Sequence, residues 1–216
     1  MKKVFVLLLC LSVWPVFAQN ATSFCTSMVT RVHVTTRIGN PKYVSSYSKT
    51  EFLQKAGRKF DPYTLGLTVS EMSIQAKATP SLDQFADRIC VGISDLDVVL
   101  DYPNLTVYID KKYAPSSCEY KIIKDHENYH VMVAQQALPF YKKDIENAIY
   151  KALQKMSPKV VYSTQDIQPT LHQLTDSVLS SVQPVLKHIN AKLLEKNAAI
   201  DTPEMYRQTT AMCKNW

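Results

Sequence analysis

Two histidines and a glutamate near the middle of the chain have the spacing of a zinc-dependent catalytic motif. His126 and His130 lie four positions apart and Glu127 follows the first of them, which gives the pattern HExxH. Residues four apart on an α-helix share one face, so both imidazoles can reach the same ion, and neutral imidazole is a good ligand for Zn²⁺. Glu127 would lie beside the metal, where its carboxylate can take a proton from water and return it to a leaving amine.

The alternative is a solvated helix face that carries these residues by chance. The flanking residues argue against it, because they are mostly apolar: Ile122, Ile123, Val131, Met132, Val133 and Ala134. Two imidazoles and a carboxylate within a buried helix need polar partners, and a metal ion supplies one. The sequence therefore predicts a metal site.

A catalytic zinc site also needs a third protein ligand and an open position for water. The metzincin pattern is excluded, because Val133 and Gln136 stand where it requires glycine and histidine. The ligand must come from a later helix, and Glu204 is the first candidate. Position 204 also suits a capping box in which the glutamate bonds the backbone of Asp201, so two interpretations of Glu204 stay open.

Three further residues could supply the third ligand. Glu146 would reach the motif if a helical hairpin turned between them, but it would lie about 24 Å from His130 along a straight helix. The other two are Asp201 and His188, although a histidine on an apolar stripe is more often part of the core.

The first 18 residues have the pattern of a secretory signal peptide. Lys2 and Lys3 precede an apolar run that continues to Phe17, and a small-residue cleavage pattern ends at Ala18. The run is too short for a membrane anchor and contains a proline. We therefore expect an exported chain, periplasmic or secreted, with no stable membrane anchor after cleavage and with residues 19–216 as a single domain.

Four cysteines follow the signal peptide: Cys25, Cys90, Cys118 and Cys213. An even number of cysteines in an exported chain indicates two disulfides. Three connectivities are possible, and we favour Cys90–Cys118 with Cys25–Cys213, because the inner pair lies within one compact segment. Free or partly paired thiols are the alternative.

Residues 19–115 have the pattern of a small, mainly antiparallel sheet. Period-two alternation or β-branched composition marks its strands: Val32 to Val34, Leu65 to Val69, Leu96 to Leu100 and Leu105 to Ile109. Turn signals separate these runs, among them Thr79-Pro80-Ser81 and Tyr102-Pro103-Asn104.

Residues 116–216 have a helical pattern. Ser116 and Glu119 fit a capping box that opens the motif helix, which extends to about Ala137, and Pro139 starts or kinks the next helix. A long amphipathic stretch follows, with apolar residues three or four apart: Leu171, Leu174, Val178, Val182, Val185, Ile189 and Leu193. The fold class is therefore α+β, with the sheet first and the helices after it.

The chain resembles the predicted secreted zinc-dependent proteases of bacteria, a family identified mainly by its HExxH helix. The resemblance covers about Leu65 to Cys213 and rests on the motif with these flanking segments: Leu65-Gly66-Leu67-Thr68, Cys90, Val107-Tyr108-Ile109-Asp110, Ser117-Cys118-Glu119-Tyr120 and Asp201-Thr202-Pro203-Glu204-Met205-Tyr206. It implies a zincin-like metallopeptidase fold, a zinc ion and an exported protein, and no defined substrate.

These observations predict an exported zinc metalloprotease that acts on peptides or proteins. Zn²⁺ would be held by His126, His130 and a third ligand such as Glu204, with Glu127 as general base. The sheet edge could align an extended substrate. Two alternatives are a non-catalytic module braced by the metal and a zinc hydrolase of cell-wall amide bonds.

Two tyrosines near the proposed site residues could assist catalysis. Tyr129 or Tyr206 could stabilise an oxyanion, although either could simply pack.

The net charge of +6 is scattered and forms no basic stripe with interleaved aromatic residues, so we expect no nucleic-acid partner.

Overall fold

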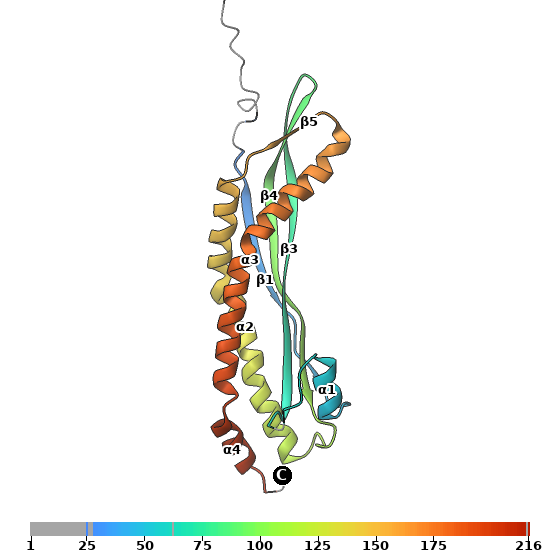
Figure 1. Cartoon of the computed structure of the whole chain (residues 1–216), viewed down its shortest axis with the longest axis vertical. Helices are drawn as coiled ribbons and strands as arrows, with labels where there is room; N and C mark the ends of the chain where they lie inside the picture. The colour runs from blue at the N-terminus through green and yellow to red at the C-terminus, as the bar shows by residue number, and fades with distance from the viewer. Residues whose placement is uncertain (1–24, 26–27, 62, 215) are drawn as a thin grey trace, which may run out of the picture.

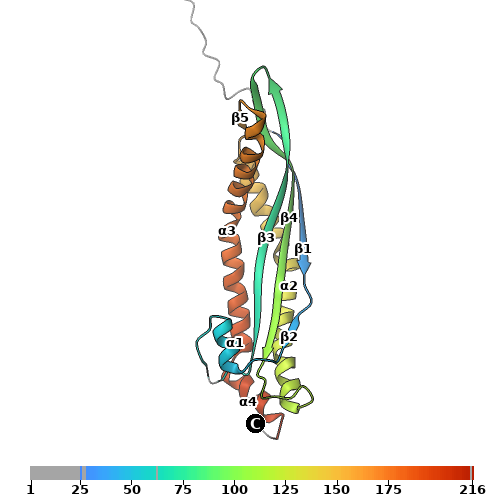
Figure 2. The same cartoon turned by 90° about the vertical axis from the view of Figure 1, so that its right-hand side faces the viewer.

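The computed structural model describes residue 25, residues 28–61, residues 63–214 and residue 216. The signal peptide expected for residues 1–18 lies outside them. The elements are β1 (Arg31–Ile38), β2 (Lys42–Val44), α1 (Lys49–Lys55), β3 (Gly66–Phe85), β4 (Arg88–Ile109), α2 (Cys118–Gln154), β5 (Lys159–Val161), a 3₁₀ turn (Thr164–Asp166), α3 (Ile167–Ile200) and α4 (Pro203–Ala211). They form an elongated body, with α1 and α4 at one end and the tip of the β3–β4 hairpin at the other (Figures 1 and 2).

The sheet is built around β4, with which every other described strand pairs. β3 runs antiparallel along one edge of β4, and β5 is also antiparallel, whereas β1 and β2 run parallel to β4. The expectation of a mainly antiparallel sheet is therefore wrong for β1 and β2, and the sheet is mixed. The chain reverses once before β3 and again in the tight turn after it, so β1 and β2 point the same way as β4.

Two of the expected turns lie inside strands. Pro80 lies within β3 and Pro103 within β4, each at or beside a shift of register in the β3–β4 ladder. Proline has no N–H to donate, so a bulge is where a strand tolerates it. The hairpin consequently has two long continuous strands where the sequence predicted shorter ones.

One face of the sheet is covered by α2 and α3 (Figures 1 and 2). The apolar residues expected from the periodicity of β4 and α3 are buried: Leu96, Val98, Leu100, Leu171, Leu174, Val178, Val182, Ile189 and Leu193. The intervening residues of β4 point to the other face, where Asp95 pairs with Arg31 of β1. The expected class, a sheet combined with helices, is thus confirmed at this level. None of the described helices is long and apolar enough to cross a membrane.

The helix that carries the motif is longer than expected. α2 is one helix of 37 residues that continues through Pro139, so no second helix starts at this proline. Leu138 and Tyr141 are buried beside the proline, and their packing holds the helix together across it. The N-cap is Ser117, one position later than the expected Ser116.

Two disulfides are present as expected, but the favoured connectivity is wrong. Cys25 pairs with Cys90, and Cys118 pairs with Cys213. The favoured Cys90–Cys118 bond is impossible because most of β4 lies between the two residues, and an extended strand covers roughly 60 Å in that many residues. Each disulfide therefore fastens one end of the molecule.

Candidate metal centre

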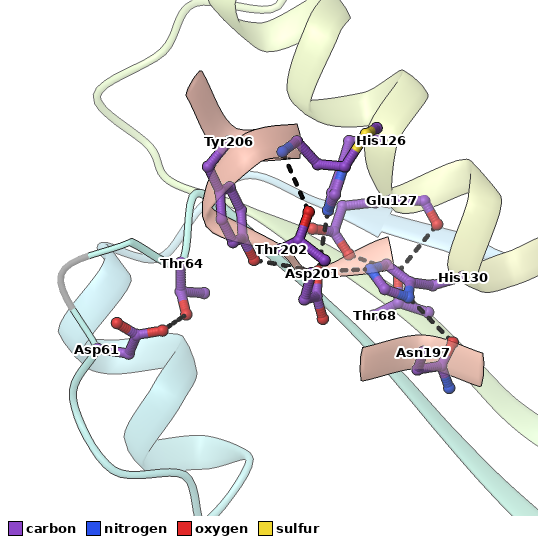
Figure 3. Close-up of polar contacts among 11 residues, drawn as sticks. Asp61, Thr64, Thr68, His126, Glu127, His130, Asn197, Asp201, Thr202 and Tyr206 are labelled. Atoms are coloured by element: carbon purple, nitrogen blue, oxygen red, sulfur yellow. Dashed lines mark hydrogen bonds and ion pairs between the residues drawn. The ribbon is translucent and has the colours of Figure 1, made fainter. Parts of the chain in front are cut away.

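Two helices meet near α4 and bring two histidines and an aspartate together. His126 and His130 lie one turn apart on α2, and Asp201 is the C-cap residue of α3. Their ligand atoms all lie within 4.8 Å of one another. Figure 3 shows both imidazole rings beside the Asp201 carboxylate. The helical spacing thus places both histidines at one point, as the sequence predicted.

One carboxylate oxygen is the common point of this cluster. Asp201 Oδ1 lies 3.1 Å from Nε2 of His126 and 3.1 Å from Nε2 of His130, and it accepts a hydrogen bond of 3.0 Å from Tyr206. On the other side of its ring, His130 Nδ1 lies 3.0 Å from Asn197 Oδ1. Because an amide oxygen only accepts hydrogen bonds, Nδ1 carries the proton, and Nε2 of the neutral ring is left to bind a metal.

The donor set and its spacing fit a metal ion such as zinc. Two ligands about 2.0–2.1 Å from a tetrahedral ion lie roughly 3.3 Å apart. The histidine nitrogens lie 3.1 Å from Asp201 Oδ1, which is close to that value. Three protein ligands with a position left open are typical of catalytic zinc sites. Among the described residues, the cluster contains these three ligands and no fourth His, Cys, Asp or Glu.

The charges of the cluster stabilise one another. Burial by itself lowers the pKa of His130, but the hydrogen bond with Asp201 and the charge of Glu127 outweigh burial and raise this pKa to about 9. Burial disfavours the charged form of Asp201, yet its hydrogen bonds with His126 and His130 hold the pKa of this carboxyl well below its usual range. Metal ligation requires neutral imidazole, so a cation that binds here displaces a proton.

Glu127 is enclosed between α2 and the start of β3. It is only 3% exposed, and Thr68 donates its hydroxyl to Glu127 Oε2 at 2.7 Å. Gly66 leaves the room for it, because a Cβ at position 66 would lie 2.8 Å from both Cγ and Oε1 of Glu127. Desolvation raises the pKa of Glu127, against the charge of His130 and the Thr68 hydrogen bond. A fixed carboxyl with raised proton affinity suits a general base.

A cleft of about 690 Å³ opens beside the cluster. Glu127, His130 and Asp201 line it, together with the last turns of α3, the start of β3 and the segment that follows α1. Tyr206 also lines the cleft, and burial together with the charge of Asp201 raises the pKa of its phenol. The phenol therefore keeps its proton, and the cleft has the size of a site for a small molecule or short peptide.

Glu204, the first candidate for the third ligand, is not part of the cluster. Its side chain lies on the exposed part of α4 and pairs with Arg207. The expected capping box is also wrong, because Thr202 is the N-cap of α4 and accepts a hydrogen bond from the N–H of Met205. The Asp201 side chain therefore does not cap α4, and its carboxylate is the one that meets the histidines.

The other candidates lie elsewhere. Because α2 is continuous, Glu146 is about 24 Å from His130 along the helix, and it pairs with Lys142. His188 lines a separate groove between α2 and α3. Of the two tyrosines that could stabilise an oxyanion, Tyr129 is exposed at the surface of α2, whereas Tyr206 lines the cleft.

Three residues that hold the cluster in place were given no role from the sequence: Gly66, Thr68 and Asn197. A signal for Asn197 was present, because it lies four positions before Asp201 on the same helix face, the spacing that the two histidines have. Gly66 and Thr68 lie in a segment that supports the resemblance, but no local signal indicates their contact with Glu127, which only the packing of the sheet against α2 creates.

Comparisons of this chain with protein-family models, with curated proteins and with solved structures found no match. The resemblance to secreted zinc-dependent proteases therefore stays a prediction. The fold and the site define a class: a mixed α/β protein with a possible metal site of two histidines and one aspartate beside a buried glutamate.

Proposed function

We propose that this chain is an exported zinc-dependent peptidase. The observation that carries the proposal is the convergence of His126, His130 and Asp201 beside the buried Glu127. Glu127 and two of the three possible ligands, His130 and Asp201, line an open cleft. The resemblance to secreted zinc-dependent proteases supports the peptidase activity. The two disulfides support export, because disulfides persist mainly in oxidising compartments.

Each residue of the site has one task in the proposed mechanism. His126, His130 and Asp201 would hold zinc, which when bound would supply Lewis acidity and make water acidic enough to lose a proton near neutral pH. Glu127 accepts a proton from the attacking water and passes it to the leaving amine. The phenol of Tyr206 donates a hydrogen bond to the substrate carbonyl oxygen as negative charge develops there.

Residues around the ligands keep these groups in position. Asn197 fixes the ring and the tautomer of His130, and Thr68 holds one carboxylate oxygen of Glu127. Outer partners of this kind are worth about 10–100-fold in metal affinity or activity.

The outer edge of β3 is suited to present an extended substrate. Within the described part of the chain β3 pairs only with β4, and Leu67, Thr68 and Ser70 near its start line the cleft. A peptide that added to this edge as a further strand would pass its backbone across the metal cluster.

A purely structural metal is less well supported. Structural zinc sites are closed by four protein ligands, whereas the described residues supply three here and the cleft reaches two of them. A structural site also gives no reason to bury Glu127, since burying a carboxyl costs stability.

The test combines metal content with peptide hydrolysis for the purified wild type, His126→Ala and Glu127→Gln. We expect about one zinc per chain in the wild type and in Glu127→Gln, and none in His126→Ala. Only the wild type should cleave a mixed peptide library. A protein that stays free of zinc when zinc is supplied would refute the site, and full activity in Glu127→Gln would refute the mechanism.

A further inference from the structure

The cleft beside the metal cluster has a wall that carries positive charge. Arg58 and Lys59, in the segment that follows α1, line the cleft with exposed side chains. The backbone of Arg58 is held in place by the end of α1. Gly57 takes a positive φ of 64° that turns the chain, and the N–H of Arg58 donates to the carbonyl of Leu53 at 2.8 Å. Leu53 is itself buried, so this wall is anchored.

The acidic residues that line the cleft are already engaged. Asp61, the one on the same wall, accepts the N–H of Tyr63 and the hydroxyl of Thr64, both at 3.0 Å; Figure 3 shows the contact with Thr64. At the metal cluster, Glu127 is held by Thr68, and Asp201 faces the two histidines.

The two basic side chains, in contrast, have no such partner. Among the described residues, neither Arg58 nor Lys59 has an acid within ion-pair distance, whereas Arg31, Arg37 and Arg207 each pair with one. Two cationic groups at the rim of a cleft attract anionic groups of a ligand and repel cationic ones. Before Asp201, the α3 residues that line the cleft are uncharged, since Leu194 and Ala198 are apolar and Asn197 is a neutral amide.

We propose that Arg58 and Lys59 are specificity-determining residues that select substrates with a carboxylate next to the bond to be cleaved. The proposal rests on the peptidase function proposed above and names its substrate class. The carboxylate has two possible sources, an Asp or Glu side chain within the peptide or the C-terminal carboxylate of the peptide. The first describes an endopeptidase with acidic specificity, and the second describes a carboxypeptidase.

The test uses three fluorogenic peptides of one length. The first has an internal glutamate and blocked ends, the second has lysine in place of that glutamate, and the third is neutral with a free C-terminal carboxylate. They are compared on the wild type, on Arg58→Glu/Lys59→Glu, and on Lys151→Glu/Lys155→Glu. The last variant is the matched control, because it makes the same change of net charge in the separate groove between α2 and α3.

We expect the wild type to favour the first or the third peptide over the second by about fivefold or more in kcat/KM. The peptide that is favoured identifies the source of the carboxylate. The preference should weaken with added salt, reverse in Arg58→Glu/Lys59→Glu and persist in the control. Equal cleavage of all three peptides, or a preference that survives the reversal at positions 58 and 59, would overturn the proposal.

A binding measurement separates this proposal from the peptidase function. The same peptides, labelled for fluorescence anisotropy, are titrated onto zinc-loaded Glu127→Gln with and without the substitutions at positions 58 and 59. Tighter binding of a carboxylate peptide, lost on charge reversal while the zinc content is unchanged, supports the proposal even if the wild type cleaves nothing. Binding that ignores the carboxylate refutes it even if the wild type cleaves peptides.

Discussion

At the scale of single residues, Asp201 is the side chain that joins two histidines into a candidate metal site. Its Oδ1 is the point that both Nε2 atoms approach, and the phenol of Tyr206 and the end of α3 hold it there. Its pKa lies well below the usual range, so it is charged at any pH at which the histidines can bind a metal.

Replacing this one carboxylate should therefore weaken metal binding without disturbing the fold. Asp201→Asn keeps the shape but removes the charge, and we expect the Kd for zinc to rise at least about 100-fold, more than the loss of an outer partner costs. Glu204→Gln is the control and should leave the Kd unchanged, because Glu204 pairs with Arg207. Competition titration with a zinc chelator measures both, and equal effects would contradict the assignment of Asp201.

A second prediction concerns Gly66. Its missing side chain makes room for Glu127 and for Ile123, so the Cβ in Gly66→Ala would meet atoms of both at 2.8 Å. Overpacking of this kind costs about 1–3 kcal/mol of stability, and it should displace the general base and cut peptide hydrolysis by about tenfold or more. Zinc content should stay at the wild-type level. Urea denaturation and initial rates check the two effects, and a wild-type rate would show that Glu127 does not depend on this contact.

At the scale of elements, the two disulfides fasten opposite ends of the molecule. Cys118–Cys213 joins the first residue of α2 to the segment just after α4, at the end of the molecule that holds the His126, His130 and Asp201 cluster (Figure 1). Cys25–Cys90 joins the chain to β4 near the hairpin tip. One of them therefore supports the placement of Tyr206 and Asp201, and the other does not.

This difference predicts different consequences for two double variants. Cys118→Ser/Cys213→Ser and Cys25→Ser/Cys90→Ser should each lose about 2–5 kcal/mol of stability. Only the first should also weaken zinc binding, since α4 is then free to move away from α2. Thermal unfolding and zinc titration compare the two variants, and equal zinc binding by both would contradict the prediction.

What the sequence could predict at this scale follows from how local each signal is. The spacing of His126 and His130, the buried periods of β4 and α3, and the number of disulfides depend on short stretches, and the structure confirms them. The parallel pairing of β1, the disulfide partners and the ligand from α3 depend on segments far apart in the chain. The sequence also predicted turns at Pro80 and Pro103 and the start or a kink of a helix at Pro139. Tertiary packing instead carries β3, β4 and α2 on through these prolines as continuous elements.

At the scale of the whole molecule, metal binding and folding should be coupled. The cluster joins residues of α2 to the end of α3, and these two segments come together only in the folded chain. A ligand that binds only the folded state stabilises it by about 2.7 kcal/mol at a free concentration of 100 Kd. We expect zinc to raise the Tm of the wild type, a chelator to reverse the rise, and Asp201→Asn to show little of it. Calorimetry measures this shift, and an equal rise in the variant would place the zinc elsewhere.

The central position of β4 also sets the order in which the molecule can form. Every other described strand pairs with β4. The contact between Arg31 of β1 and Asp95 of β4 joins residues that are 64 positions apart in the chain. A chain that leaves a ribosome or a translocation channel N-terminus first must hold β1, β2 and β3 without a sheet until β4 has emerged, and such non-local pairing is slow. The aspartate of the cluster emerges later still. In the proposed exported zinc peptidase, the ion would therefore be captured only after both α2 and the end of α3 have been delivered, in the compartment where the protein folds.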